Sequence, residues 1–239
     1  MNSRITTAHD IRRILRKLGR KRQARVLQRY FKTGPGEYAE GDIFLGIRVP
    51  QLRKLASEYR DMRLKDVERL LQSPVHEDRL FALLVLVNRF ARAGTSEQRN
   101  IFRLYFRNTQ FVNNWDLVDL SAPQIVGGFL AARDKAPIAC LAESASVWDR
   151  RISIMSTFQF IRKGQFSEAL KIAGILIEDE EDLVHKAVGW MLREIGKRDM
   201  PVEEKFLKQN YRRMSRTTLR YAIEKFPENK RRKYLAGKI

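Results

Sequence analysis

The residues best suited to chemistry in this sequence are an aromatic ring and a carboxylate that stand four positions apart. Trp115 and Asp119 follow Asn113 and Asn114, and asparagine is a common residue at the start of a helix. In a helix that begins there, positions four apart share a face. A ring attracts a cation through its π electrons and a carboxylate attracts it by charge, so the pair suits a flat, positively charged group. The alternatives are ordinary ones, since a single Trp is often a core residue and an Asp in a first turn is often a cap.

The other two tryptophans also lie beside charged residues at helical spacing. Trp148 is three residues from Arg151, and Trp190 lies between Lys186 and Arg193 at spacings of four and three. Arginine is well suited to bind the phosphates of a nucleic acid that presents such a cationic group. Together the three segments predict a site with aromatic walls, one carboxylate and flanking cations.

These segments belong to a repeated pattern that must position them. Three stretches align with one another, residues 75–82, 147–154 and 182–189, and a fourth, 217–223, fits more loosely; each has a basic residue at the matching place. The basic residues are Arg79, Arg151, Lys186 and Arg220. Their separations indicate a repeat of about 35 residues with two helices per unit, including one repeat near position 115.

The repeat predicts an all-α superhelical solenoid of HEAT-like helix pairs, formed by residues 1–239 as a single domain, with a basic groove on its concave face. Strand-like alternation is absent from the sequence, and breaks such as Gly34-Pro35-Gly36 divide it into helices of ordinary length. The alternative for the repeated basic residues is that each pairs with a neighbouring acid and joins adjacent repeats.

The charge of the chain points to a polyanionic partner. Lys and Arg number 47 against 28 Asp and Glu, for a net charge of +19. The excess is concentrated in residues 1–33 and 205–239, at about +10 each, and both segments keep the apolar spacing of folded helices. We expect these helices to grip a nucleic-acid backbone at two places; a solvated basic surface and an anionic membrane surface are the alternatives.

Several other classes of protein are disfavoured. Cys140 is the single cysteine, and His9, His76 and His185 lack the spacing of metal ligands, so we expect neither a disulfide nor a metal site nor another cofactor. The first ten residues contain no apolar run typical of a secretory signal, and no apolar stretch approaches the ~20 residues that span a bilayer. The sequence therefore predicts a soluble protein without a membrane partner, cytoplasmic or, in a prokaryote, associated with the nucleoid.

The chain resembles the DNA alkylation repair enzymes built from HEAT-like repeats, the AlkD-type alkylpurine DNA glycosylases. The resemblance runs from about Phe44 to about Tyr221 and rests on four segments, residues 44–50 (FLGIRVP), 115–119 (WDLVD), 148–151 (WDRR) and 186–194 (KAVGWMLRE). It implies removal of positively charged N3- or N7-alkylated purines from double-stranded DNA by hydrolysis of the N-glycosidic bond.

The resemblance also implies roles for individual residues. Asp119 stands at the position of the catalytic carboxylate, and Trp115 and Trp190 match the aromatic pair beside the damaged base. Tyr30 matches an aromatic residue near the N-terminal end of the site. The DNA-binding residues are Arg151 and Arg193 by resemblance, with Lys186 and Arg220 added by their repeat positions.

The chemistry requires little beyond one carboxylate. An N3- or N7-alkylated purine is already positively charged and leaves as a neutral base, so no general acid is needed. Asp119 then stabilises the cationic sugar and accepts a proton from water, although Asp116, three residues away, is a candidate second acid. Lys186 is a candidate lyase nucleophile, but binding of a phosphate or a contact between repeats is the stronger interpretation of this residue. The sequence therefore predicts a monofunctional enzyme. The alternatives are a non-catalytic nucleic-acid-binding protein and a scaffold for an acidic partner, and we expect a monomer.

Overall fold

The computed structural model describes residues 6–239, and its regular elements are helices. An isolated β-bridge between Ile43 and Val75 is the one extended pairing in that range. The all-α prediction is therefore confirmed. Contacts divide the chain into two compact units, residues 1–125 and 126–239, which are described separately below. The expected single domain over residues 1–239 stays a prediction.

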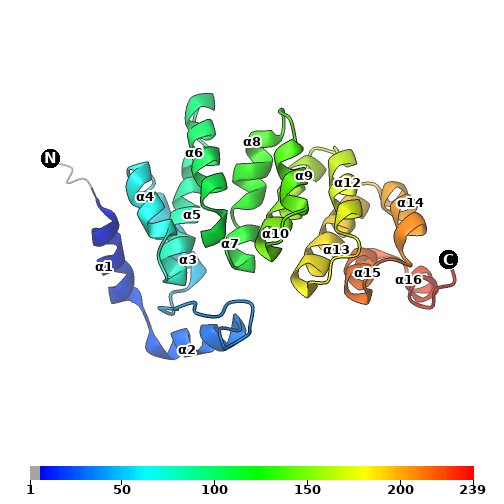
Figure 1. The fold of residues 1–239 in the computed structure, drawn as a ribbon, viewed down its shortest axis with the longest axis horizontal. Coiled ribbons are helices and arrows are strands. Elements are labelled where there is room, and N and C mark those ends of the chain that lie inside the picture. The colour runs from blue at the N-terminus through cyan, green and yellow to red at the C-terminus, as the bar shows by residue number, and fades with distance from the viewer. Residues whose placement is uncertain (1–5) are drawn as a thin grey trace. The chain divides into compact units, whose positions relative to one another are not determined.

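The first unit is organised around one buried helix, α5. Its helical elements are α1 (Ala8–Leu18), α2 (Lys21–Tyr30), α3 (Val49–Glu58), α4 (Leu64–Leu71), α5 (His76–Phe90), α6 (Thr95–Arg107), the 3-10 turn η1 (Thr109–Phe111) and α7 (Trp115–Asp119) (Figure 1). The helices α3 and α4 both pack on α5, and α1 packs on α4 and α5. Because α5 is covered on several sides, its residues from His76 to Leu86 are all buried.

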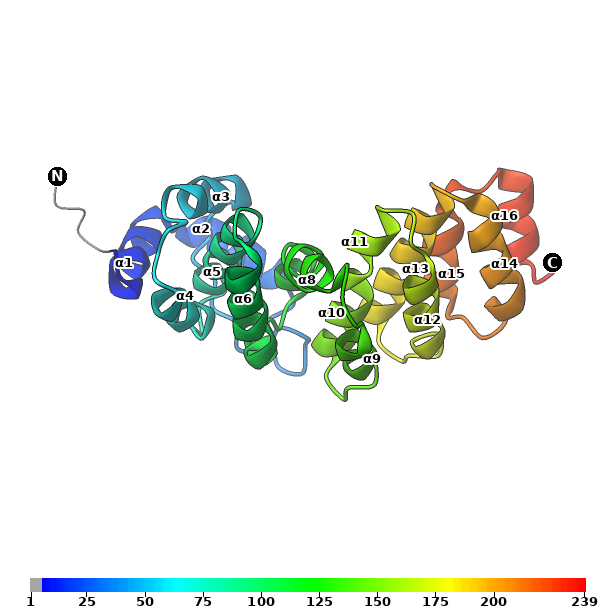
Figure 2. The same ribbon diagram turned by 90° about the horizontal axis from the view of Figure 1, so that it is seen from above.

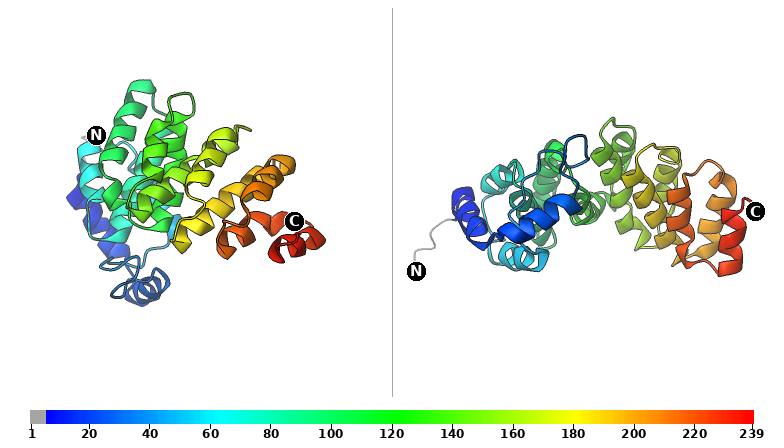
Figure 3. Two further views of the ribbon diagram at one scale, coloured as in Figure 1. Left: turned by 45° about the vertical axis from the view of Figure 1, so that its right-hand side comes forward. Right: turned by 90° about the horizontal axis from the view of Figure 1, so that it is seen from below.

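The second unit repeats helix pairs along the chain. After a π-helical turn (Pro123–Gly127) come α8 (Gly128–Leu130), α9 (Ala136–Ala142), α10 (Val147–Ser156), α11 (Phe158–Ile161), α12 (Ser167–Ile175), α13 (Asp182–Gly196), α14 (Met200–Asn210), α15 (Arg216–Ala222), the 3-10 turn η3 (Ile223–Lys225) and α16 (Glu228–Leu235) (Figure 2). The pairs α9–α10 and α12–α13 lie side by side (Figure 3).

Close packing in the second unit depends on a glycine in α13. A Cβ atom added to Gly189 would lie 2.5 Å from the carbonyl oxygen of Thr218 and 2.5 Å from the Cβ atom of Tyr221. The absence of a side chain therefore lets the backbones of α13 and α15 approach each other.

The repeat deduced from the sequence is confirmed in its helices. Arg79 is the fourth residue of α5, and Arg151, Lys186 and Arg220 are the fifth residues of α10, α13 and α15. The repeat expected near position 115 corresponds to the start of α7. The basic segments near the two ends also form helices, as predicted. No helix within residues 6–239 is both long enough and apolar enough to cross a bilayer.

Candidate functional site

The carboxylate and the ring singled out in the sequence lie at the two ends of the short helix α7. Asn114 is buried at its N-terminus, and its side-chain oxygen accepts a hydrogen bond of 2.8 Å from the backbone N–H of Trp115. This contact confirms the predicted asparagine cap. Trp115 and Asp119 are both partly exposed.

An aromatic cluster surrounds Trp115. The ring of Tyr30, from the end of α2, meets it edge-on with 6.0 Å between centroids, so the structure brings these two predicted site residues together. Phe31 stacks on Trp115 at 5.1 Å, and Phe44 stacks on Phe31 at 5.0 Å. Tyr30 is 64% exposed, and its ring is the part of the cluster most open to solvent. The sequence analysis missed Phe31, whose one signal was its place next to Tyr30.

A chain of buried, charged side chains connects α7 to α5. The guanidinium of Arg79 donates to Asp42 at 2.7 Å, the ring of His76 is 3.2 Å from Asp42 through Nδ1, and its Nε2 is 2.9 Å from Asp116. All four side chains are buried, and Asn114 donates to Asp42 at 3.3 Å. Asp116 therefore ties the first turn of α7 to α5. These contacts support the interpretation of Asp116 as a structural residue of the helix start.

The imidazole of His76 is positively charged in this environment. Burial alone would lower its pKa, but the charge of Asp116 and the hydrogen bonds to Asp116 and Asp42 outweigh burial and raise the pKa to about 9. A protonated ring donates from both nitrogens, which matches a carboxylate on either side. The pKa of Asp42 is correspondingly lowered: its burial acts in the opposite direction but is outweighed by its bonds to His76 and Arg79.

Residues 44–48 of the FLGIRVP segment form a loop that α5 fixes beneath α2, and Val49 and Pro50 begin α3. The carboxylate of Glu77 accepts hydrogen bonds from the backbone N–H groups of Leu45, Gly46 and Ile47 at 2.8, 2.7 and 3.2 Å. Gly46 has a φ of 83°, and a Cβ atom there would lie 2.4 Å from the carbonyl oxygen of Arg20. The segment is thus a structural support for α2.

A cavity of about 330 Å³ lies next to the aromatic cluster. Its apolar lining consists of Leu27, Phe31, Phe44, Ile47, Val49, Pro50 and Leu80, and its polar lining of Gln23, Arg48, His76, Glu77 and Asp116. Within residues 6–239 no three His, Cys, Asp or Glu side chains are arranged to hold a metal ion.

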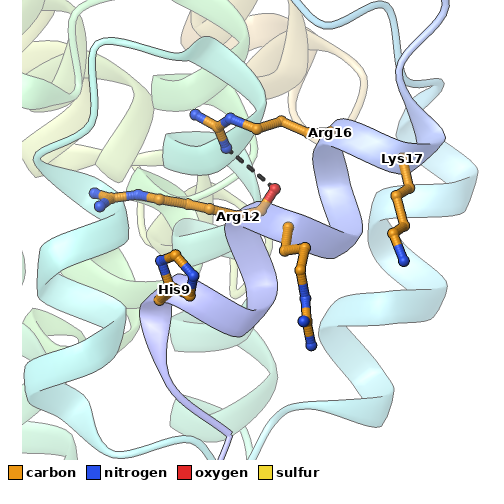
Figure 4. Close-up of a pocket in the computed structure, with 5 residues that line it drawn as sticks. His9, Arg12, Arg16 and Lys17 are labelled. Carbon is orange, nitrogen blue, oxygen red and sulfur yellow. Dashed lines mark hydrogen bonds between the residues drawn. The ribbon is translucent and has the colours of Figure 1, made fainter.

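A second hollow, of about 600 Å³, opens along α1, away from this cluster. It is lined by His9, Arg12, Arg13, Arg16 and Lys17 (Figure 4). Arg12 and Arg16 lie 3.5 and 3.7 Å from the buried carboxylate of Asp78, so these two cations anchor α1 to α5.

In the second unit, Arg151 is buried, with 5% of its surface exposed. Its guanidinium donates a hydrogen bond to the backbone carbonyl of Leu183, next to the start of α13. The contact joins α10 to α13 through a backbone carbonyl, whereas the structural alternative for the repeated basic residues expected an acid as the partner. A DNA-binding role for Arg151 stays a prediction.

Two of the other predicted DNA-binding residues form ion pairs with acidic residues. Lys186 forms an ion pair of 2.7 Å with Asp182 one turn earlier in α13, and Arg193 is paired with Glu224. The hydrogen bond that Lys186 donates to Asp182 raises the pKa of Lys186, which keeps its amine protonated. Arg220, in α15, is exposed.

Trp190 is partly exposed on α13. Its indole N–H donates to the carboxylate of Glu194 at 3.3 Å, and its ring lies 6.4 Å from the ring of Phe158. Phe158 was not among the predicted residues, because nothing in its local sequence distinguishes it from a core aromatic. The structure thus places Tyr30, Trp115 and Asp119 in the first unit and the remaining predicted site residues in the second.

A comparison with known protein families gives a match over most of the chain. The sequence model of the DNA alkylation repair enzyme family matches residues 11–226, which is most of the chain. The chain belongs to the DNA alkylation repair enzyme family. No curated protein matches the sequence significantly.

Solved structures similar to this DNA alkylation repair family member include proteins from two bacteria. A predicted DNA alkylation repair enzyme from Enterococcus faecalis has 18% identity and a TM-score of 0.66, covering 88% of this chain and 97% of its own. The protein smu.31 from Streptococcus mutans has 18% identity and a TM-score of 0.54, with coverages of 93% and 100%. AlkD2 from Streptococcus mutans has 19% identity and a TM-score of 0.53, with coverages of 87% and 99%. At these identities the likeness concerns the fold.

Proposed function

We propose that the protein is a monofunctional DNA glycosylase that removes positively charged N3- or N7-alkylated purines from double-stranded DNA. The observation that supports this most is the presence of Trp115 and Asp119, both partly exposed, on one short helix of a DNA alkylation repair family member. Tyr30 extends the aromatic surface next to Trp115, so a cationic base can rest on electron-rich rings beside a carboxylate.

In the proposed reaction, the bond between the sugar carbon C1′ and the purine nitrogen breaks and its electron pair goes to the purine. The base was cationic and leaves neutral, so the developing positive charge is on the sugar. Asp119 stabilises that charge and takes a proton from the water whose oxygen bonds to C1′. The products are the free base and an abasic site.

The second unit contributes binding in this proposal. We assign Trp190 to the substrate, and Lys186, Arg193 and Arg220 to the DNA backbone. For Arg151 the burial and the bond to Leu183 favour a join between helices. A lyase reaction would need an uncharged amine, and the raised pKa of Lys186 opposes that role.

The decisive test is base release from a duplex with one 7-methylguanine, without added metal. Wild type is compared with Asp119→Asn and with Asp61→Asn, which changes an exposed acid of the same unit. We expect Asp119→Asn to lose at least about 100-fold in single-turnover rate, while duplex affinity stays within about threefold, because the carboxylate acts on the transition state. Asp61→Asn should behave as wild type.

Two results would count against the proposal. Full activity of Asp119→Asn would refute the role of that carboxylate. Tight duplex binding by wild type without any base release would favour the alternative of a non-catalytic nucleic-acid-binding protein.

A further inference from the structure

Beside the ring of Trp190 lies a buried carboxylate to which the sequence analysis gave no role. Glu194 follows Trp190 by one turn of α13, and 7% of its surface is exposed. Its Oε1 atom accepts the indole N–H of Trp190 at 3.3 Å and a hydrogen bond of 2.6 Å from the ammonium group of Lys197. Its Oε2 atom accepts a hydrogen bond of 3.0 Å from the guanidinium group of Arg198. One carboxylate thus joins an aromatic ring to two cations.

The place of Glu194 in α13 is not explained by the stability of the helix. The residue lies in the last turn, where the helix dipole disfavours a negative charge. Burial acts to raise the pKa of Glu194, but the hydrogen bonds from Lys197 and Arg198 outweigh burial, and the pKa is lowered. Glu194 is therefore a carboxylate at neutral pH, in a position where helix formation alone favours a neutral or basic residue.

The packing around α13 fixes this group in place. The helices α10, α12, α14 and α15 all pack on α13, and Figure 2 shows α13 beside α12 and α15. Arg198 also donates to the backbone carbonyl of Glu194 at 2.7 Å, so its guanidinium is bound at two points. Trp190 is partly exposed, whereas Glu194 is buried. Of the ring and the carboxylate, the ring is the part open to contact, so Glu194 acts on a bound molecule through Trp190.

Two electrostatic effects follow from the carboxylate. A ring attracts a cation through its π electrons, and a carboxylate that accepts the indole N–H polarises the ring so that its face becomes more negative. The carboxylate also offsets the charges of Lys197 and Arg198, which would otherwise be two uncompensated cations near the ring. Both effects favour a cationic base on Trp190 over a neutral base of the same shape.

We propose that Glu194 is a positioning residue for Trp190 and makes the ring selective for a positively charged base. The carboxylate orients the indole through its N–H, strengthens the attraction of the ring for a cation and neutralises the two neighbouring cations. It takes no part in breaking the glycosidic bond. This inference rests on the proposed function, which assigns Trp190 to the substrate, and it adds a residue that selects for the charge of the base.

The test measures binding to three duplexes that differ at one base, so it does not depend on base release. The first contains 7-methylguanine on a sugar with fluorine at C2′, which slows loss of the base because fluorine withdraws electrons from C1′. The second contains 7-methyl-7-deazaguanine, a neutral base of the same shape, and the third contains guanine. Fluorescence anisotropy gives the three affinities. The ratio of the first affinity to the second is the preference for charge, and a loss of folded protein leaves that ratio unchanged.

Glu194→Gln removes the charge but keeps an oxygen that accepts the indole N–H. We expect the preference for charge to fall by about fivefold or more, which is the size of one cation–π contact. Affinity for the undamaged duplex should not fall, because the variant is more positive by one charge. The matched control is Glu178→Gln, which removes an acid of the same unit that is paired with Arg213 at 2.8 Å, and it should leave the preference unchanged.

Two further variants test the mechanism. Lys197→Gln changes an exposed side chain and should raise the preference for charge by about twofold or more, because Glu194 is then less neutralised. In a Trp190→Phe background the indole N–H is gone, so the effect of Glu194→Gln should be smaller than in the wild-type background. If Glu194→Gln does not fold, the rise in Lys197→Gln decides the question, and its absence overturns the inference.

The inference is also overturned if wild type shows no preference for the cationic base, if Glu194→Gln leaves the preference unchanged, or if Glu178→Gln lowers it equally. Base release by wild type together with an unchanged preference in Glu194→Gln would leave the proposed glycosylase activity in place. Absence of 7-methylguanine release by wild type, with the effect of Glu194→Gln present, would instead remove the proposed activity and leave Glu194 as a determinant of cationic-base binding.

Discussion

Replacing His76 should remove a large part of the pH dependence of stability in the first unit. The folded ring has a pKa of about 9, against an ordinary value of 6.5 in an unfolded chain. The folded state therefore holds the proton more tightly. The resulting stabilisation is fully present below about pH 6.5 and is lost as pH rises through 9. At about 1.4 kcal/mol per pKa unit, the wild type should lose about 3 kcal/mol of unfolding free energy over that interval.

The assay uses Trp115 as a reporter of the first unit. In a background with Trp148→Phe and Trp190→Phe, urea unfolding followed by fluorescence gives the unfolding free energy near pH 6 and near pH 10. His76→Gln cannot gain the second proton, so the difference between the two proteins should shrink by about 3 kcal/mol as the pH rises. Other titrating groups are common to both proteins and cancel in that difference.

A second variant keeps the experiment decisive if His76→Gln does not fold. Asp116→Asn retains the shape of the side chain but removes the charge that contributes most to raising the pKa of His76. The pH at which stability is lost should then move downward. If the free energy of unfolding changed with pH in the same way in wild type and both variants, the buried charge chain would not be what supports α7.

Three further comparisons test other features of the structure. Gly46→Ala should lower the free energy of unfolding by about 3 kcal/mol, because Gly46 has a positive φ and an added Cβ atom would clash with the backbone. Gly36 has a φ of 74° but open space around it, so Gly36→Ala should cost about 1–2 kcal/mol. Urea titration measures both. Arg151→Ala should lower the free energy of unfolding by about 2 kcal/mol, because the buried side chain loses its hydrogen bond to a carbonyl. Replacing the exposed Arg220 by Ala should change the free energy of unfolding by less than about 0.5 kcal/mol and weaken duplex binding. Equal stability of the two variants would contradict this expectation. Burial raises the pKa of Glu203 to about 8, so the folded protein loses stability as pH rises from about 4.5 to 8, and Glu203→Gln should exceed wild type by on the order of 4 kcal/mol above pH 8 and match it near pH 4 in thermal or urea unfolding.

The helix pairs and the start of α7 could be predicted from the sequence because their signals are local. Apolar spacing gives the helices, the repeated basic residue gives the period, and Asn114 before Trp115 gives the cap. The resemblance to a known family supplied Tyr30, and the structure places its ring against Trp115.

The charge chain beneath α7 had no local signal. Asp42, His76 and Asp116 are far apart in the sequence, and His76 was considered only as a metal ligand and dismissed. Burial of a basic residue is equally hard to foresee. Arg151 has the same repeat position as the exposed Arg220, but it is buried and donates a hydrogen bond to the carbonyl of Leu183.

The charge chain also has a consequence for synthesis on the ribosome. Asp42, His76 and Arg79 emerge before Asp116, so a nascent first unit holds the imidazole without its second carboxylate. Domains generally fold from the N-terminus as they are made, and here the last segment to emerge supplies the counter-charge. We expect the pKa of the ring to reach its full value only when Asp116 arrives with α7, so the docking of the helix that contains Asp119 is coupled to proton binding at His76.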